Sequence, residues 1–202
     1  MDDLAKRPIP KRFEFLLATM TSDRFLKMEG LGNEVPFFIC PYEAEEELQM
    51  ERVAKQLRDA LANQGHPVLL IDLYELSIAL IKARGIWEDT LAVEASTPKD
   101  QFLEHLQSVL DSEHHLIPAI RDKLSEKKYD VLFLVGVGAV YPYIRSHTIL
   151  NNLQSTAKDL PTVLFFPGEY KRSSLEGSSL NLFGRLSDDN YYRAFNIYQF
   201  QS

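Results

Sequence analysis

Short apolar runs recur along the chain, and four of them predict the buried strands of a sheet. They cover residues 35–40, 67–72, 129–135 and 162–166. Apolar residues follow one another in these runs instead of alternating with polar ones, which is typical of parallel strands that are covered on both faces. Residues 192–197 are a further candidate, which would close the sheet as a last strand.

Between these runs, apolar residues recur at helical spacing. The pattern predicts helices over residues 10–28, 43–64, 73–83, 98–110, 117–124 and 144–153. Residues 171–179 are polar and are predicted to form a mobile loop. The alternation of strands and helices predicts one α/β domain over residues 1–202, with a mainly parallel sheet of about five strands and helices on both faces. The N-terminal helix is expected to pack on this domain.

The net charge and the hydropathy of the chain indicate which kinds of partner and which cellular compartment to expect. The formal net charge is −7, which disfavours binding to phosphate backbones because such binding needs clustered lysines and arginines. No apolar run reaches the ~20 residues that cross a bilayer, so we expect a cytoplasmic protein without a membrane partner. The single cysteine, Cys40, ends an apolar run and is expected to be a buried core residue.

The carboxyl ends of parallel strands meet at one edge of a sheet, and this edge commonly carries function. Each of the four predicted strand ends has a tyrosine within a few residues. Tyrosine combines apolar surface with a hydroxyl, so the edge suits a ligand crevice or a docking surface, while the alternative is ordinary loop packing. The candidate partner-binding residues are Tyr42, Asp72, Tyr74, Tyr141, Arg145, His147, Glu169, Tyr170 and Arg185.

A Gly-Val-Gly sequence at residues 136–138 follows the third predicted strand, as glycine loops do in nucleotide-binding folds. It lacks the lysine and hydroxyl of a P-loop and the third glycine of a dinucleotide site, so we expect a nucleotide-binding type of fold without a P-loop and without ATP hydrolysis. The strand that ends at Asp72 has the form of a Walker B strand, but that pattern is common in parallel sheets. Asp72 is instead expected to be a helix N-cap or a loop anchor.

Polar residues concentrate in the last third of the chain without forming a known catalytic motif. The sequence contains no His-x-x-x-His pair, Gly-x-Ser-x-Gly elbow or cysteine cluster, so no catalytic residue, metal or cofactor is predicted. Arg145 and Arg185 offer planar donor forks that we expect to form internal ion pairs with carboxylates near them in the sequence. Those carboxylates are Glu169, Asp188 and Asp189. A hydrolase that uses them, or Asp72, with a divalent metal is a further hypothesis.

The most distinctive stretches of the chain lie in its last third. They are residues 136–153 (GVGAVYPYIRSHTILNNL), 165–170 (FFPGEY), 179–186 (SLNLFGRL) and 188–195 (DDNYYRAF). Together with residues 36–40 and 71–76, they resemble the BrxB family of BREX systems. The likeness covers most of the chain and is weakest in the N-terminal helix and in residues 86–127.

The resemblance implies a role in bacterial defence against phages. BREX systems mark host DNA by adenine methylation, and their enzymatic steps lie with a DNA methyltransferase, a large ATPase and PglZ, a member of the alkaline-phosphatase superfamily. The family offers no catalytic residues to transfer. We therefore expect a non-catalytic adaptor or scaffold that binds another BREX protein, with PglZ as the expected partner, through the edge rich in tyrosine and arginine. The alternative is a nucleotide- or nucleic-acid-sensing module that does not hydrolyse its ligand.

Overall fold

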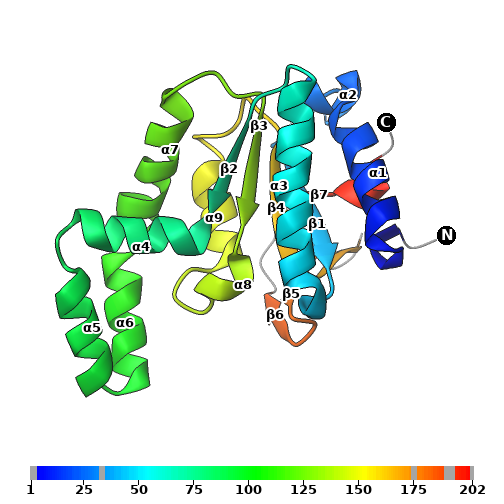
Figure 1. The fold of residues 1–202 in the computed structure, drawn as a ribbon. Helices are drawn as coiled ribbons and strands as arrows, with labels where there is room; N and C mark the ends of the chain where they lie inside the picture. The colour runs from blue at the N-terminus through cyan, green and yellow to red at the C-terminus, as the bar shows by residue number, and fades with distance from the viewer. Residues whose placement is uncertain (1–3, 32–34, 174–176, 189–193, 201–202) are drawn as a thin grey trace.

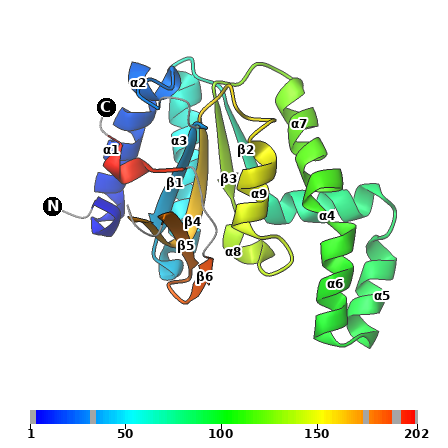
Figure 2. The same ribbon diagram turned by 180° about the vertical axis from the view of Figure 1, so that it is seen from behind.

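A parallel sheet of five strands forms the centre of the protein (Figures 1 and 2). The computed structural model describes residues 4–31, 35–173, 177–188 and 194–200. The strand order is β2-β3-β4-β1-β7, and every neighbouring pair is parallel. The strands are β1 (Phe37–Tyr42), β2 (Val68–Asp72), β3 (Val131–Val135), β4 (Thr162–Ser173) and β7 (Phe195–Asn196). The predicted fold class is therefore confirmed.

Helices cover both faces of the sheet, because successive side chains of a strand point to opposite sides. Phe38 and Cys40 of β1 pack with apolar side chains of α1 (Ile9–Met20) and α3 (Glu47–Asn63). Phe37 and Ile39 lie in the opposite core. That core includes residues of α4 (Leu73–Ala83), α7 (Ile117–Ser125) and α9 (Ser146–Leu153). All six residues of β1 are buried, which explains its continuous apolar sequence.

The first predicted helix is two helices rather than one. α1 ends at Met20, and α2 (Asp23–Leu26) begins after a break. At the break, the Thr21 and Ser22 hydroxyls donate to carbonyls of the preceding turn, and the Ser22 hydroxyl also accepts a hydrogen bond from the Phe25 amide. Hydroxyl side chains compete in this way with the backbone pattern of a helix, so the apolar spacing alone placed the end of this helix too late.

Helix α3 is preceded by a 3-10 turn at Ala44–Glu46 and ends before Gly65, whose φ of +91° lies in the region that favours glycine. The predictions over residues 43–64, 73–83 and 117–124 are confirmed. The helix α6 (Lys99–Val109) matches the one predicted over residues 98–110, except that Pro98 is its N-cap and not its first helical residue.

A helix that the sequence did not predict, α5 (Trp87–Ser96), pairs with α6. The two form a helical hairpin that projects away from the sheet beyond α4 (Figure 1). The apolar residues of α5 are spread around the helix, and most of its residues are at least partly exposed, so the pattern lacks a single apolar face.

Strand β4 continues past the parallel sheet into an antiparallel hairpin. Its second half pairs with β5 (Gly177–Leu182), which pairs in turn with β6 (Leu186–Asp188). The prediction of a mobile loop over residues 171–179 is therefore wrong at the described positions, because residues 171–173 lie in β4 and residues 177–179 lie in β5. The sequence signal for these strands is an alternation of apolar and polar residues. The apolar residues Tyr170, Leu180 and Leu182 are buried, as expected for strands with one face in solvent.

The last predicted strand, residues 192–197, is β7 in the structure, which covers Phe195–Asn196 and pairs with β1. Residues 192 and 193 lie outside the described part. None of the described helices combines the length and apolar character that a membrane span requires.

Candidate functional site

The carboxyl ends of the strands gather four elements at one edge of the sheet (Figures 1 and 2). They are the first turns of α3 and α4, the short helix α8 (Val137–Val140) and the β5–β6 hairpin. We call this region the carboxyl edge. Because the four strands that feed these elements are parallel, segments that are far apart in the sequence meet here.

Asp72 holds the first turn of α4 in place. Its carboxylate accepts hydrogen bonds from the backbone amides of Tyr74, at 2.9 Å, and Glu75, at 3.2 Å, so the predicted helix N-cap is confirmed. The same carboxylate oxygen lies 2.8 Å from the position that a Cβ of residue 136 would take, which a glycine leaves free. Asp72 thus has a structural role, because it fixes the start of α4 and lies against Gly136.

The glycine-bearing loop after β3 is covered by the hairpin. The ring of Phe183, in the β5–β6 turn, lies 3.0 Å from the position of a Cβ on Gly138, and the Pro167 ring lies 3.2 Å from it. A nucleotide-binding loop offers its glycine backbone to phosphates. Here an aromatic and a proline ring occupy that side of Gly138, which disfavours the nucleotide-sensing alternative.

Two of the predicted tyrosines are buried. The Tyr42 hydroxyl donates to Glu47 at 2.9 Å, and the Tyr170 hydroxyl donates to the carbonyl of Ala194 at 2.6 Å. Burial raises the pKa of Tyr42, and the negative charge of Glu47 adds to this shift. Both hydroxyls are used inside the protein, so these tyrosines support the edge from within.

The other tyrosines lie closer to the surface. Tyr74, on the first turn of α4, is 45% exposed, and Tyr141 and Tyr143, after α8, are half-buried. Burial raises the pKa of Tyr143 to about 12, and the nearby Tyr74 contributes to the same shift. Helices α4 and α8 contact each other, so Tyr74 and Tyr143 stand on neighbouring elements of the edge.

The predicted arginine–carboxylate pairs do not form among the described residues. Glu169 pairs with Lys171 at 2.7 Å, and the Lys171 hydrogen bond lowers the pKa of Glu169. Arg145 and Arg185 are exposed, and His147 is half-buried on the first turn of α9. The side chain of Asp188 and the whole of Asp189 lie outside the described part of the chain.

The carboxyl edge carries most of the large apolar side chains that are exposed among the described residues. Five large hydrophobic side chains of the described residues stand out as exposed, namely Leu48 (69%), Tyr74 (45%), Leu91 (39%), Leu186 (39%) and Phe183 (37%). All but Leu91, on α5, belong to the edge. Sequence reasoning found only Tyr74, because the exposure of a leucine at a helix start or a phenylalanine in a turn depends on the tertiary fold.

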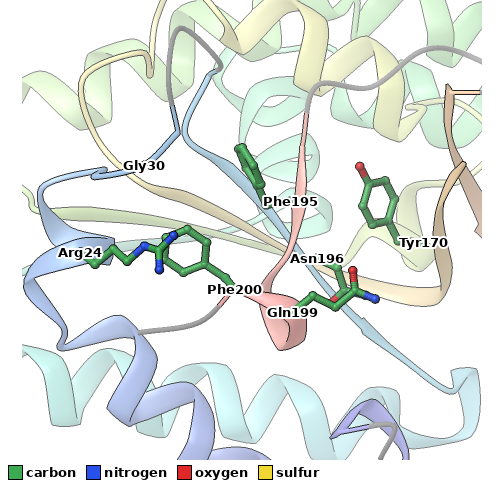
Figure 3. A pocket seen from close by; sticks show the side chains of 7 residues that line it. All are labelled: Arg24, Gly30, Tyr170, Phe195, Asn196, Gln199 and Phe200. Atoms are coloured by element: carbon green, nitrogen blue, oxygen red, sulfur yellow. The ribbon is translucent and has the colours of Figure 1, made fainter. Parts of the chain in front are cut away.

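A pocket of about 280 Å³ lies at the β7 side of the sheet (Figure 3). Its lining residues are Arg24, Gly30, Tyr170, Phe195, Asn196, Gln199 and Phe200. The Arg24 guanidinium stacks 5.0 Å above the centre of the Phe200 ring, and the Asn196 side chain accepts from the Tyr198 amide. Several polar groups of this lining are therefore already engaged within the protein.

The hydrolase hypothesis gains no support from the geometry. Asp72 caps a helix and Glu169 pairs with a lysine, so the two carboxylates are used separately. Within the described ranges, no group of three or more histidine, cysteine, aspartate or glutamate side chains is arranged to hold a metal ion.

Comparisons with known proteins assign the chain to a family. The model of the family "BREX protein BrxB" matches residues 69–197, which is more than half of the chain. The chain belongs to the BrxB family. It is 34% identical over 195 residues to a BREX protein BrxB from Bacillus cereus (strain H3081.97), covering 95% of this chain and 98% of that protein.

A second BrxB protein, from Escherichia coli O9:H4 (strain HS), is 28% identical over 186 residues, covering 92% of this chain and 90% of that protein. No solved structure matches the chain. The region matched by the BrxB family model runs from β2 to the end of β7, so it contains α4, α8 and the hairpin of the carboxyl edge. Membership of the BrxB family supports a role for this chain in a BREX system.

Proposed function

We propose that this BrxB protein is a non-catalytic adaptor that binds another BREX protein, PglZ, through its carboxyl edge. The observation that carries the proposal is the set of apolar side chains exposed there: Leu48, Tyr74, Phe183 and Leu186. Exposed apolar groups gathered on one face are typical of interaction surfaces. We place the assembly in the cytoplasm, where the DNA on which BREX systems act is found.

The energetics favour a protein partner for this surface. Burial of apolar area contributes roughly 25 cal/mol per Å², and aromatic residues are enriched among the side chains that dominate binding. Tyr74 and Phe183 supply two such aromatic groups, and the half-buried Tyr141 and Tyr143 extend them. Tyr74 stands on the first turn of α4 and Phe183 in the tight β5–β6 turn, so little conformational freedom of these two residues is lost on binding.

The internal use of the polar groups supports a role without catalysis. Asp72 caps α4, Tyr42 donates to Glu47, and the Tyr170 hydroxyl donates to a backbone carbonyl. A general acid or base has to reach a substrate from the surface of a cleft. At the carboxyl edge, these groups hold the framework on which the exposed apolar side chains stand.

The test is the affinity of the purified chain for purified PglZ, measured by isothermal titration calorimetry. Replacing both Leu48 and Tyr74 by alanine should weaken binding by about 2 kcal/mol or more, roughly 30-fold, if they are central contacts. Leu91→Ala is the matched control, because Leu91 is also exposed but lies on α5. Unchanged binding in the double variant, or no binding of PglZ or any other BREX component, would refute the proposal.

A further inference from the structure

The parallel sheet ends on one side in a strand of five residues. In the order β2-β3-β4-β1-β7, β2 pairs with β3, and no other described strand lies beyond it. In Figure 1 this strand lies between α3 and α7, with no other helix or strand drawn in front of it. We call the outer side of this strand the β2 edge.

The backbone groups at the centre of the β2 edge point away from β3. The Pro67 carbonyl accepts a hydrogen bond from the amide of Asp130, just before β3, so residue 67 faces that strand. Successive residues of a strand direct their N–H and C=O groups to opposite sides. Leu69 and Ile71 therefore face β3, while Leu70, between them, faces outward. Within the described ranges, no hydrogen bond holds these outward groups of Leu70, so they can pair with an added strand.

The β2 edge lacks the features that usually keep an edge strand from pairing. Such features are proline, charged side chains and a very short strand. Residues 68–71 are Val-Leu-Leu-Ile, and Leu69 and Leu70, which point to opposite faces of the sheet, are only half-buried. The other edge of the sheet is protected by its length, because β7 has two residues. A strand added at the β2 edge would extend the apolar layer over both leucines.

The amino end of the β2 edge carries more positive than negative charge. The loop from α7 to β3 reaches the sheet there, beside the start of β2 (Figure 1). It carries the exposed Lys127 and Lys128 next to one exposed carboxylate, Glu126. The other carboxylate of this loop, Asp130, is paired with His66, just before β2, at 3.2 Å.

The carboxyl end of the β2 edge carries negative charge. Asp72, the last residue of β2, caps α4, and Glu75 on the first turn of α4 is exposed. The first cation of α4 is Lys82, near its other end. A second copy of this chain in antiparallel orientation would place the basic end of each copy beside the acidic end of the other. A two-fold axis makes this contact twice, and complementary charge fixes the orientation.

We infer that two copies of this chain pair through antiparallel β2 strands, so that the two sheets become one. The register that overlaps all five residues places Leu70 opposite the partner's Leu70, on the two-fold axis. There the two residues exchange their outward N–H and C=O groups in two hydrogen bonds. Main-chain hydrogen bonds and burial of apolar side chains then stabilise the same contact. The inference does not depend on the proposed docking function.

The experiment measures the mass of the complete chain by size-exclusion chromatography with light scattering. At about 100 μM, the wild type should have twice the 23.2 kDa of one chain. Leu70→Lys and Leu70→Glu each place like charges opposite one another, which destabilises a strand pair, so each variant alone should have the mass of one chain. An equal mixture of the two should form a dimer again, because opposite charges then meet. Leu91→Lys, at an exposed position of α5, is the control and should remain a dimer.

A second measurement needs no substitution, so it holds even if a charge at the half-buried position 70 prevents folding. In the wild type, the amide of Leu70 should be protected from hydrogen exchange at high protein concentration and should lose that protection on dilution. A wild type with the mass of one chain would overturn the inference. So would a dimer that both Leu70 variants leave intact, or folded variants whose mixture stays monomeric. Protection of the Leu70 amide that appears only when another BREX protein is added would also overturn it, because the added strand would then come from that protein.

Discussion

Arg12 of α1 donates a hydrogen bond to the carboxylate of Glu46, in the 3-10 turn that leads into α3. The arginine is 1% exposed and also donates to the carbonyl of Ala5 at 3.0 Å. Burial acts to lower the pKa of Arg12, but the hydrogen bond to Glu46 and the nearby Tyr198 outweigh it and leave the pKa raised. This pair ties the N-terminal helix to the turn beside the carboxyl edge.

Replacement of Glu46 by glutamine should lower the free energy of unfolding. The buried guanidinium would keep a neutral acceptor but lose its countercharge, at a cost of roughly 1–3 kcal/mol, less than for a fully buried pair because Glu46 is partly exposed. The measurement is urea denaturation. Glu14→Gln is the control, since the Lys11–Glu14 pair is exposed and should contribute less than about 0.5 kcal/mol. Equal effects of the two changes would contradict the assigned role.

Glu47 should make stability depend on pH in a defined direction. Its pKa is raised, first by burial, so the folded protein favours the protonated acid and this contribution is lost as the pH rises through the folded pKa. In Glu47→Gln that loss is absent, while the side-chain amide oxygen of the variant can still accept from Tyr42. The free energy of unfolding of the variant, relative to the wild type, should therefore increase between about pH 4 and pH 8.

Denaturation at a series of pH values measures this difference. Glu104→Gln, on the exposed side of α6, is the control for loss of a surface carboxylate. A difference that shrinks with rising pH would mean that Glu47 is stabilised in its charged form.

The contact of Phe183 with Gly138 should appear as coupling in a double-mutant cycle. Gly138→Ala places a methyl group about 3 Å from the ring of Phe183, which should destabilise the protein by roughly 1–3 kcal/mol. In a Phe183→Ala background, that cost should fall by at least about 0.5 kcal/mol. Pro167 remains close to the new methyl group, so part of the cost should persist. Additive effects of the two changes would show that the hairpin does not rest on this loop in solution.

Cys40 should resist thiol reagents while the protein is folded. It is fully buried, and burial raises the pKa of its thiol to about 12, although the hydrogen bond to Tyr198 opposes this shift. Only the thiolate reacts, so iodoacetamide at pH 8 should label the native protein far more slowly than the protein in urea. Mass spectrometry measures the labelled fraction. Comparable rates in the two states would contradict a buried thiol.

The sequence predicted an element correctly where burial makes its pattern of apolar residues regular. The strands β1 to β3 and the first part of β4 were predicted because each reads as an apolar run that is buried or half-buried. The β5–β6 hairpin was missed because one face is in solvent, so polar residues interrupt it. Helix α5 was missed because its apolar residues have no single face.

The candidate surface could be predicted only in part, for a related reason. The rule that parallel strands end at one edge placed Tyr74 and Asp72 correctly at the carboxyl edge. It could not show that Tyr42 and Tyr170 turn inward, or that Leu48 is exposed, since those outcomes depend on which side chains the fold brings over each position. The cover that Phe183 forms over Gly138 is likewise a contact between distant parts of the chain.

The position of β1 within the sheet bears on how the protein is made. β1 lies between β4 and β7, and both of these neighbours follow residue 161 in the chain. During translation, six apolar residues therefore leave the ribosome long before either pairing strand exists, and contacts between such distant segments form slowly. Exposed strand edges of this kind are prone to aggregate in nascent chains. Loss of β7 would leave one side of β1 unpaired, so β1 has both of its pairing neighbours only after residue 196 has been made.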